Sequence, residues 1–358
     1  MPSRVIVLAP SWLGDAVMAL PALAGVRRAY ASGTLIIGAR APVASLFRLV
    51  PDVDEIVELA GKSGIASLSG RRGDTARLAA ARGGIAVLFP NSFASAWVTW
   101  RARIPERWGY RTDWRRPLLT RAVPRPGGSR HLSEYYQALV AALGIDGGGP
   151  PARVAVGGEP LARARELLAD EGWRPDTPLA GIAPGAAYGQ AKRWPPERYA
   201  ALIVRLAAEL GATAVLVGSA DDRPTGVEIE RRLARDRVER IDRAAGRARW
   251  VNLIGRTDLP LVMAVMASCR AFVSNDTGAM HLAAAEGVGV TAIFGPTIEQ
   301  ETAPLPREAH TVLTHPVWCR PCMLRECPID HRCMTGIGVD RVFEAVRRQL
   351  SRAGDSGQ

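Results

Sequence analysis

Residues 4–30 read RVIVLAPSWLGDAVMALPALAGVRRAY, and this stretch decides the fold class. Val5–Ala9 is an unbroken apolar run, which is typical of a strand covered on both faces in a parallel sheet. Ala16–Tyr30 repeats its apolar residues at helical spacing. Between them, Pro10–Asp15 forms a short loop in which Gly14 allows a close approach to the backbone. A strand, a short loop and a helix in this order predict the opening of a Rossmann-like α/β unit.

The same alternation of strands and helices continues along the chain. In the first half the predicted strands are Val5–Ala9, Thr34–Gly38, Glu55–Leu59 and Ile85–Phe89, and the predicted helices are Ala16–Tyr30, Pro42–Val50 and Thr75–Arg82. In the second half the predicted strands are Leu179–Ala183, Thr213–Val217, Ala271–Ser274 and Val290–Phe294, and the predicted helices are Pro196–Leu210, Asp221–Arg235, Leu259–Ser268 and Thr277–Glu286.

One segment interrupts this rhythm. Gly144–Pro151 reads GIDGGGPP and predicts a linker. After it, Ala152–Trp173 holds a strand-like segment and the predicted helix Leu161–Glu171. We therefore expect an α/β protein with two Rossmann-like domains, residues 1–150 and 151–358, built on parallel sheets. Ligands of such sheets bind at the carboxyl ends of the strands, which here means a cleft between the domains.

Length and composition limit the class of protein. A chain of 358 residues suggests two domains, and 47% hydrophobic with 23% charged residues is typical of a globular protein. The sequence has no run of about 18 apolar residues, and its first apolar run ends before Pro10, so we expect neither a membrane-spanning helix nor a secretory signal. These features predict a cytoplasmic protein.

The chain is strongly basic. Forty-six Lys and Arg residues against 35 Asp and Glu give a formal net charge of +11. Only Lys62 and Lys192 are lysines, and this excess of arginine is typical of a GC-rich coding bias. A basic chain can bind nucleic acid, an anionic membrane face or a phosphorylated substrate. Because the arginines look scattered and no recognition motif accompanies them, we do not expect nucleic acid as a partner.

Asp15 ends the first loop, where the first predicted helix begins. One interpretation is that its carboxylate caps the helix, a common role of aspartate at this position. The other is that it acts catalytically, because it lies at the ligand-binding edge of the predicted sheet.

A second loop, Pro184–Pro195, reads PGAAYGQAKRWP and follows the first strand of the second half. A loop of small residues that ends in a basic pair can bind a diphosphate. Lys192 stands out because arginine serves almost every other basic position, and a compact ammonium charge differs from a guanidinium. The alternative is a solvated loop lysine.

A third loop, Ser274–His281, reads SNDTGAMH. We expect Asp276 to be the N-cap of a helix with Thr277 and Gly278 in its first turn, leaving amides aimed at a phosphate. His281 follows Thr277 by four residues and shares its face of the helix. It is interpreted either as a ligand-binding residue or as a core histidine.

Four of the five cysteines lie close together, as Cys319-x2-Cys322-x4-Cys327-x5-Cys333 with His315 and His331 beside them. Convergent thiolates can hold a structural zinc ion or an iron–sulfur cluster. Two disulfides, or four reduced and metal-free thiols, are the alternatives. Cys269 is expected to be a buried, small apolar residue.

Three common motifs are missing from the sequence: the GxxxxGK[ST] phosphate loop, GxGxxG after the first strand, and the GxSxG elbow. The chain instead resembles the ADP-heptose:lipopolysaccharide heptosyltransferases of glycosyltransferase family 9. The matching segments, in family order, are PSWLGDAVMALPAL, LFPNSFASA, PGAAYGQAKRWP, VLVGSADD, NLIGRTDL, SNDTGAMHLAAA and FGPT. CRPCMLRECPIDHRCM resembles the cysteine-rich ending of members that add the second heptose.

The resemblance implies a GT-B fold, with an acceptor-binding domain at 1–150 and an ADP-heptose-binding domain at 151–358 that includes the cysteine-rich segment 315–334. It implies inverting transfer of L-glycero-D-manno-heptose from ADP-heptose to the first heptose of the lipopolysaccharide inner core. Asp15 matches the family's general base, and Lys192 matches a lysine on the donor phosphates. The other donor-site matches are Asp276, Thr277, Gly278 and His281, with Asp222 and Thr257 near the ribose and adenine.

The resemblance also implies partners and limits. No metal is required for catalysis, so zinc or an iron–sulfur cluster at Cys319, Cys322, Cys327 and Cys333 would be structural. The expected protein is a monomer with peripheral contact to the anionic inner-membrane face. The chain departs from the related first heptosyltransferase at Ala187 and Tyr188, where that enzyme has hydroxyl residues.

Other functions fit parts of the same pattern. One is a different heptosyltransferase step of this family, and another is a nucleotide-sugar epimerase with the same two-domain architecture, which would need no acceptor. A non-catalytic protein that binds an anionic partner would leave the loops at Asp15, Lys192 and Asp276 without a role.

Overall fold

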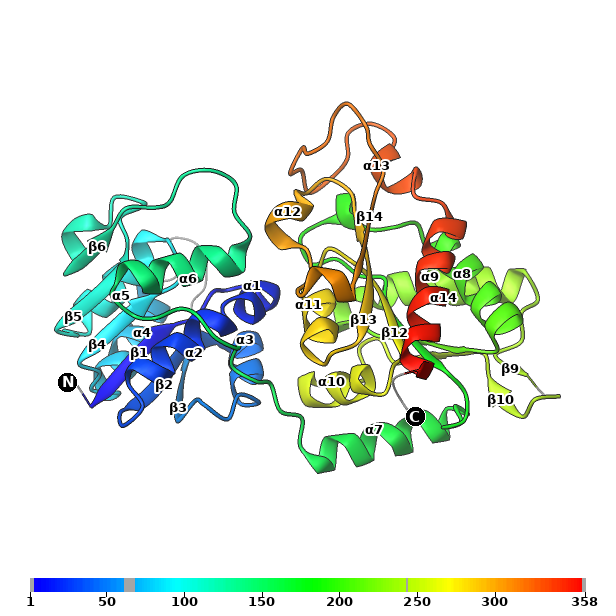
Figure 1. Cartoon of the computed structure of the whole chain (residues 1–358), viewed down its shortest axis with the longest axis horizontal. Coiled ribbons are helices and arrows are strands. Elements are labelled where there is room, and N and C mark those ends of the chain that lie inside the picture. The colour runs from blue at the N-terminus through cyan, green and yellow to red at the C-terminus, as the bar shows by residue number, and fades with distance from the viewer. Residues whose placement is uncertain (1–2, 61–67, 243, 356–358) are drawn as a thin grey trace. The chain divides into compact units, whose positions relative to one another are not determined.

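The computed structural model describes residues 3–60, 68–242 and 244–355. It divides into two compact units, Met1–Ala155 and Val156–Gln358 (Figure 1). Each unit is built on one six-stranded sheet, and all strand pairings within these two sheets are parallel. The predicted fold class, α/β with two parallel sheets, is therefore confirmed.

The N-terminal sheet has the strand order β3-β2-β1-β4-β5-β6. Its strands are β1 (Arg4–Leu8), β2 (Thr34–Arg40), β3 (Glu55–Leu59), β4 (Ile85–Leu88), β5 (Glu106–Tyr110) and β6 (Arg121–Val123). Its helices are α1 (Leu13–Met18), α2 (Leu20–Ala29), α3 (Ala41–Phe47), α4 (Leu68–Ala80), α5 (Phe93–Arg101) and α6 (Leu132–Ala142), with a 3₁₀ turn η2 (Arg116–Leu118).

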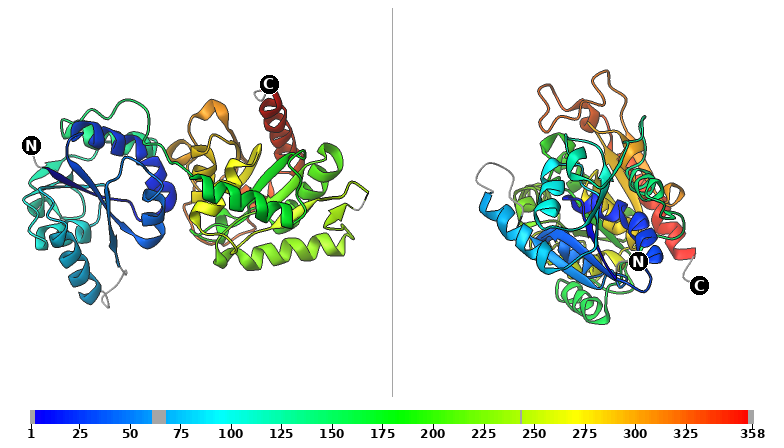
Figure 2. Two further views of the ribbon diagram at one scale, coloured as in Figure 1. Left: turned by 90° about the horizontal axis from the view of Figure 1, so that it is seen from below. Right: turned by 90° about the vertical axis from the view of Figure 1, so that its left-hand side faces the viewer.

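Strand β1 is buried on both faces of this sheet. Ile6 and Leu8 point to one face and pack in a cluster with Leu78 and with Ala96 of α5. Val5 and Val7, also buried, point to the other face because side chains alternate along a strand. Helices lie on both sides of the sheet (Figure 2), which explains why this strand is apolar at every position.

The C-terminal sheet repeats the same topology, in the order β11-β8-β7-β12-β13-β14. Its strands are β7 (Leu179–Ala183), β8 (Thr213–Leu216), β11 (Trp250–Asn252), β12 (Ala271–Asn275), β13 (Gly289–Phe294) and β14 (Thr311–Thr314), with a separate hairpin of β9 (Ile241–Asp242) and β10 (Arg247–Ala248). Its helices are α7 (Gly158–Asp170), α8 (Pro196–Leu210), α9 (Arg223–Arg235), α10 (Leu259–Ala267), α11 (Gly278–Ala285), α12 (Glu299–Thr302), α13 (Arg332–Thr335) and α14 (Val339–Asp355), with 3₁₀ turns η3 (Gln190–Lys192), η4 (Ala220–Asp222) and η5 (Arg307–Ala309).

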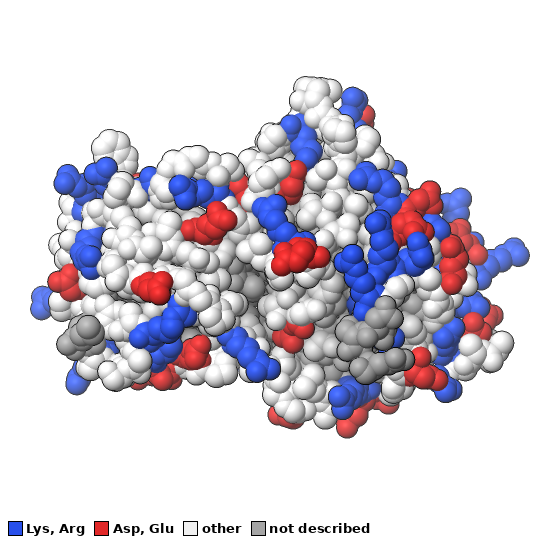
Figure 3. Space-filling view, in the orientation of Figure 1, with Lys and Arg blue, Asp and Glu red and all other residues white. Residues whose placement is uncertain are grey.

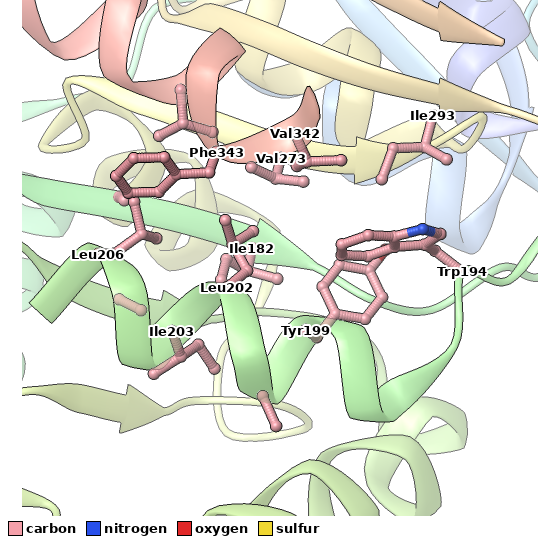
Figure 4. Packing of buried hydrophobic residues seen from close by; sticks show 14 of the residues in the cluster. Ile182, Trp194, Tyr199, Leu202, Ile203, Leu206, Val273, Ile293, Val342 and Phe343 are labelled. Atoms are coloured by element: carbon pink, nitrogen blue, oxygen red, sulfur yellow. The ribbon is translucent and has the colours of Figure 1, made fainter. Parts of the chain in front are cut away.

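Helices α8 and α14 supply much of the core of this unit (Figure 4). Tyr199, Leu202 and Leu206 recur on one face of α8 at helical spacing and are fully buried. Trp194 meets the Tyr199 ring edge to face, with centroids 4.8 Å apart. Phe343 of α14 joins the same cluster. Burying a side chain of this size stabilises the folded state by about 1.5–3 kcal/mol. The cluster therefore holds α8 and α14 against the sheet whose strands lead into the site loops.

Several predicted elements differ from the structure. Helix α4 begins at Leu68, seven residues before the predicted helix Thr75–Arg82. The predicted helix Ala16–Tyr30 is two helices that begin at Leu13 and Leu20, because Pro21 has no amide to continue the first one. The prediction of a strand-like segment after Gly144–Pro151 is wrong, because residues 151–157 form no strand. Instead, the Ala152 and Ala155 amides donate to Leu20 and Leu49, which ties this connection to the N-terminal unit. Among the helices in the described ranges, none is both long enough and apolar enough to cross a bilayer.

Candidate functional site

Four loops of the C-terminal unit begin at the carboxyl ends of neighbouring strands. They follow β8, β7, β12 and β13, and in a parallel sheet these ends share one edge. The loop after β7 carries Lys192, and the loop after β12 carries Asp276. Since β7 and β12 pair directly, these two loops start side by side at the point where the strand order reverses.

Lys192 and Asp276 form a buried ion pair. The Lys192 Nζ donates to Asp276 Oδ2 at 2.5 Å, and the two side chains are 12% and 6% exposed. The same carboxylate accepts hydrogen bonds from Thr297 Oγ1 at 2.7 Å and Thr302 Oγ1 at 3.3 Å. The pair therefore holds an ammonium group, which has three protons to donate, at the ligand-binding edge.

The predicted capping role of Asp276 is wrong. Thr277 is the N-cap of α11, and Gly278 is the first residue of this helix. The Asp276 side chain turns to Lys192 instead, and the Thr277 side chain makes no capping bond to the first turn of α11. The Thr277 hydroxyl lies 3.2 Å from that of Ser274. The amides at the start of α11 are thus not capped by Thr277, which suits an anion there.

His281 lies one turn into α11 and is 5% exposed. This burial agrees with the interpretation as a core histidine. Its part in donor binding stays a prediction.

Asn275, the last residue of β12, connects the two loops and was missed by the sequence analysis. Its Oδ1 accepts from the Trp194 amide at 3.1 Å and from the Tyr199 hydroxyl at 2.9 Å. Its Nδ2 donates to the carbonyls of Pro184 and Gly185. Because the residue is fully buried, these bonds fix the Lys192 loop at both of its ends. In the sequence, the signal for this residue was a polar amide at the end of an otherwise apolar strand.

Asp222 lies on the loop after β8. Its carboxylate closes a capping box with Ser219 and comes within 3.6 Å of the Arg193 guanidinium. A Cβ atom at Gly185 would overlap this carboxylate, so the loop after β7 approaches Asp222 closely and needs glycine there.

Thr257 lies on the neighbouring loop, after β11. The two loops are joined because the Gly255 amide donates to the Gly218 carbonyl at 2.9 Å. The Arg223 side chain also donates to the Gly255 carbonyl at 2.8 Å. The structure thus brings the Asp222 and Thr257 loops together, while Lys192 contacts the loop after β12, whose Asp276 accepts from Thr297 of the loop after β13.

Tyr188 lies beside Lys192. The Lys192 Nζ lies 4.9 Å from the centre of the Tyr188 ring, within range of a cation–π interaction. The Tyr188 hydroxyl donates to the Met323 carbonyl at 2.7 Å. The Tyr188 ring thus lies against Lys192, and its hydroxyl connects the loop to the cysteine-rich segment.

The cysteine-rich segment contacts two of the site loops. On the loop after β13, the Pro296 carbonyl accepts from the amides of Cys322 and Met323, at 3.1 and 3.0 Å. On the loop after β7, the Ala191 amide donates to Arg325, and the Ala191 carbonyl lies 2.5 Å from His331 Nε2. The segment therefore links the loop that carries Lys192 to the loop that carries Thr297. A pocket of about 590 Å³ lies between residues 190–197 and 326–331.

The cysteines themselves form no disulfide among the described residues. No three His, Cys, Asp or Glu side chains in the described ranges are grouped closely enough to hold a metal ion. Burial raises the pKa of the Cys333 thiol, and Cys322, Cys327 and Cys319 add to this effect. The four thiols are thus near one another, but as placed they do not form a metal-coordinating group. Cys269 is buried, as predicted.

Asp15 belongs to the N-terminal unit, at the carboxyl end of β1. The N-cap of α1 is Trp12, so Asp15 lies in the first turn and the predicted capping role is wrong. Its side chain is partly buried near Tyr136 of α6. Burial raises the pKa of Tyr136, and the Asp15 carboxylate raises it further.

Comparison with known proteins decides the family. The pattern of glycosyltransferase family 9 (heptosyltransferase) matches residues 76–332. The chain belongs to glycosyltransferase family 9. A lipopolysaccharide heptosyltransferase 2 from Salmonella typhimurium is 30% identical over 98% of this chain and 99% of its own. Membership of family 9 makes the chain a transferase.

Solved family 9 structures have the same architecture. The structure of ADP-heptose lipopolysaccharide heptosyltransferase II from E. coli is 28% identical, with a TM-score of 0.80 over 98% of this chain and 99% of its own. A glycosyltransferase family 9 structure from Veillonella parvula has a TM-score of 0.84 over 98% of both chains at 20% identity, which supports the fold alone. The predicted GT-B type of this family 9 chain is therefore confirmed.

Proposed function

We propose that this chain transfers L-glycero-D-manno-heptose from ADP-heptose to the first heptose of the lipopolysaccharide inner core, with inversion. The observation that carries the proposal is the buried Lys192–Asp276 pair at the carboxyl edge of the C-terminal sheet, beside the start of α11, which the Thr277 side chain does not cap. Full-length similarity to a lipopolysaccharide heptosyltransferase 2 supports the choice of donor, acceptor and step. The C-terminal unit would bind the donor and the N-terminal unit the acceptor.

The donor side needs positive charge where ADP leaves. Lys192 can keep its bond to Asp276 and still direct its other protons toward the diphosphate. The amides of the first turn of α11, next to Thr277 and Gly278, supply further donors. His281 would support this turn from one helical turn away. Together these groups would stabilise the leaving group without a divalent cation.

The loops after β8 and β11 are proposed to bind the nucleoside part of ADP. Asp222 would accept from the ribose hydroxyls, and the Thr257 loop would approach the adenine. The hydrogen bond between the Gly255 amide and the Gly218 carbonyl supports one joint site for the two loops.

On the acceptor side, Asp15 is proposed as the general base. The acceptor hydroxyl would lose its proton to the Asp15 carboxylate while its oxygen attacks the anomeric carbon of the donor. The bond from this carbon to the diphosphate oxygen breaks on the opposite face, and ADP leaves with the electron pair. Attack from the face opposite the leaving group inverts the anomeric configuration.

The test uses the full chain with ADP-heptose and a deacylated core acceptor that carries one heptose, with ADP release and acceptor mass as readouts. Asp15→Asn should abolish transfer and leave ADP binding unchanged. Asp52→Asn, which changes an exposed carboxylate of the same unit, is the matched control and should keep the parent rate. Transfer by the Asp15 variant at the parent rate would refute the base assignment.

Two arms of this experiment separate the alternatives. Acceptors with no heptose, one heptose and two heptoses identify the step, and only the acceptor with one should react. A nucleotide-sugar epimerase would convert the donor without any acceptor, so acceptor-independent turnover would favour that function instead.

Further parts of the proposal concern the state of the protein. We expect a monomer in the cytoplasm, in peripheral contact with the anionic face of the inner membrane. Chelation of divalent cations should leave transfer unchanged. A structural zinc ion or iron–sulfur cluster at Cys319, Cys322, Cys327 and Cys333 stays a prediction, which metal analysis of the purified protein tests directly.

A further inference from the structure

Almost all of the net positive charge of the chain lies in one unit. Residues 1–155 contain 20 Lys and Arg against 10 Asp and Glu, a net charge of +10, whereas residues 156–358 contain 26 against 25, a net charge of +1. Within the first unit, residues 101–130 alone hold nine arginines and two acidic residues. Basic residues are equally frequent in the two units, as expected from a coding bias and scattered arginines, so the difference in net charge arises because acidic residues are about half as frequent in the first unit.

Large aromatic side chains are exposed in the same region. On α5, Phe93, Trp97 and Trp100 form a continuous strip, with ring centroids 6.0 Å and 5.1 Å apart. Phe93 is 40% exposed and Trp100 is 42% exposed. Aromatic side chains of this size usually contribute to a core or to an interface, so a strip left partly open marks a contact surface.

Trp114 extends this surface from the loop between β5 and β6. It is 93% exposed. Its loop is nevertheless held firmly at the start of α5, because the Phe93 amide donates to Asp113 Oδ2 at 2.5 Å and the Thr112 hydroxyl donates to the Asn91 carbonyl at 3.1 Å. The next residue, Arg115, is fully buried. Trp114 is thus displayed by an anchored loop.

Four exposed arginines lie within three residues of Trp100 or Trp114 along the chain. Arg101, Arg103, Arg111 and Arg116 are exposed, and none of them forms an ion pair with a described residue. Exposed arginines of the C-terminal unit, by contrast, often pair locally, as Arg174 does with Asp176. Figure 3 shows basic side chains over the upper left of the N-terminal unit, where β6 lies in Figure 1.

We propose that the aromatic strip of α5 and the 111–116 loop form a docking surface for an anionic phospholipid bilayer. Tryptophan rings settle at the level of lipid headgroups, and unpaired arginines are attracted to acidic headgroups. Charge complementarity favours this occupant over a second copy of the chain, because two units of net charge +10 repel each other. The proposal locates the membrane contact of the proposed function and does not depend on the transfer reaction.

Vesicle flotation of the full chain tests this surface. The wild type should bind vesicles of phosphatidylcholine with about one third phosphatidylglycerol and should not bind pure phosphatidylcholine. Raising the salt from about 0.1 to 0.5 M should release it. Since each basic residue near such a surface strengthens binding about fivefold, a variant with Gln at the four exposed arginines should lose about a hundredfold or more.

Two further variants make the test specific. Trp114→Ala should weaken binding at least about fivefold, and this almost fully exposed side chain can be removed without unfolding the chain. The matched charge control replaces four exposed arginines of the C-terminal unit with Gln and should lose less than about threefold. Its positions are Arg163, Arg165, Arg235 and Arg237.

Several results would overturn the proposal: equal binding to neutral vesicles, no binding at all, or an equal loss in the charge control. A second copy would be the occupant if sedimentation showed a dimer that Trp114→Ala dissociates. The acceptor's phosphates would be the occupant if the four-arginine variant lost turnover on a deacylated acceptor. A wild type that binds vesicles but transfers no heptose would refute the proposed function and leave this surface intact.

Discussion

The Lys192–Asp276 pair should show strong coupling in a double-mutant cycle of Lys192→Met, Asp276→Asn and the double variant. The Asp276 substitution leaves the Lys192 ammonium on a side chain that is only 12% exposed, with the Tyr188 ring at 4.9 Å and the backbone oxygen of residue 276 at 3.4 Å. Removing one partner from a buried pair costs about 3–5 kcal/mol, and this remaining exposure puts the expected cost at about 3 kcal/mol.

The opposite substitution should cost less. Lys192→Met removes one charge-assisted hydrogen bond, but the carboxylate keeps the Thr297 and Thr302 hydroxyls as donors. We expect a loss of about 2 kcal/mol. The double variant leaves no buried charge without a partner, so it should also cost only about 2–3 kcal/mol. The coupling energy is therefore expected to be about 2–3 kcal/mol.

Native-state hydrogen exchange measures these free energies in the full chain, because amides of β12 and α8 report on the C-terminal unit. Amides of α2 in the N-terminal unit are the internal control and should not change. If the costs of the two single variants added within about 0.5 kcal/mol in the double variant, the two groups would be independent and this reasoning would be refuted.

Three further predictions address other parts of the C-terminal unit. Gly185→Ala should weaken ADP binding about tenfold in calorimetry, because its Cβ overlaps the Asp222 carboxylate, whereas Gly158→Ala, which meets no atom within 4 Å, should not. Trp194→Phe removes the indole donor to the Ile337 carbonyl, which keeps the Arg198 guanidinium as a donor, and should cost about 1 kcal/mol, or roughly 2–4 °C in Tm; an unchanged Tm would contradict this. Burial lowers the pKa of His310, whose Nδ1 accepts from the Val290 amide. The unfolded chain binds a proton as the pH falls through about 6.5 while the folded chain resists it, so stability should fall below that pH and stay constant above it. His310→Gln should flatten this dependence in urea unfolding between pH 7 and 5, and parallel curves would count against it.

Local sequence predicted the strands that are apolar on both faces. Val5–Ala9 and Leu179–Ala183 are recognisable because burial on two sides leaves no polar position. Strands β5, ERWGY, and β6, RAV, escaped prediction, because charged residues near the end of a sheet break the apolar run. Helix α14 also escaped, although its apolar face completes the core around α8.

Site positions were easier to predict than site contacts. Loops after buried strands identified Lys192 and Asp276, but the sequence suggested a helix cap for Asp276. The Asp276 carboxylate instead bonds to residues 192, 297 and 302, which are far apart along the chain. A local sequence pattern cannot predict contacts between such distant residues. The buried amide of Asn275 was missed for the same reason.

The place of α14 in the chain affects how the protein forms during translation. The described contacts of the N-terminal sheet lie within its own first 155 residues, so that unit can complete its core while the ribosome is still at work. The C-terminal core cannot, because Val342, Phe343 and Val346 fill it from the far end of the chain. Nascent chains stalled before Val342 should therefore resist protease over the first unit alone, and the proposed donor site would be the last part of the molecule to mature.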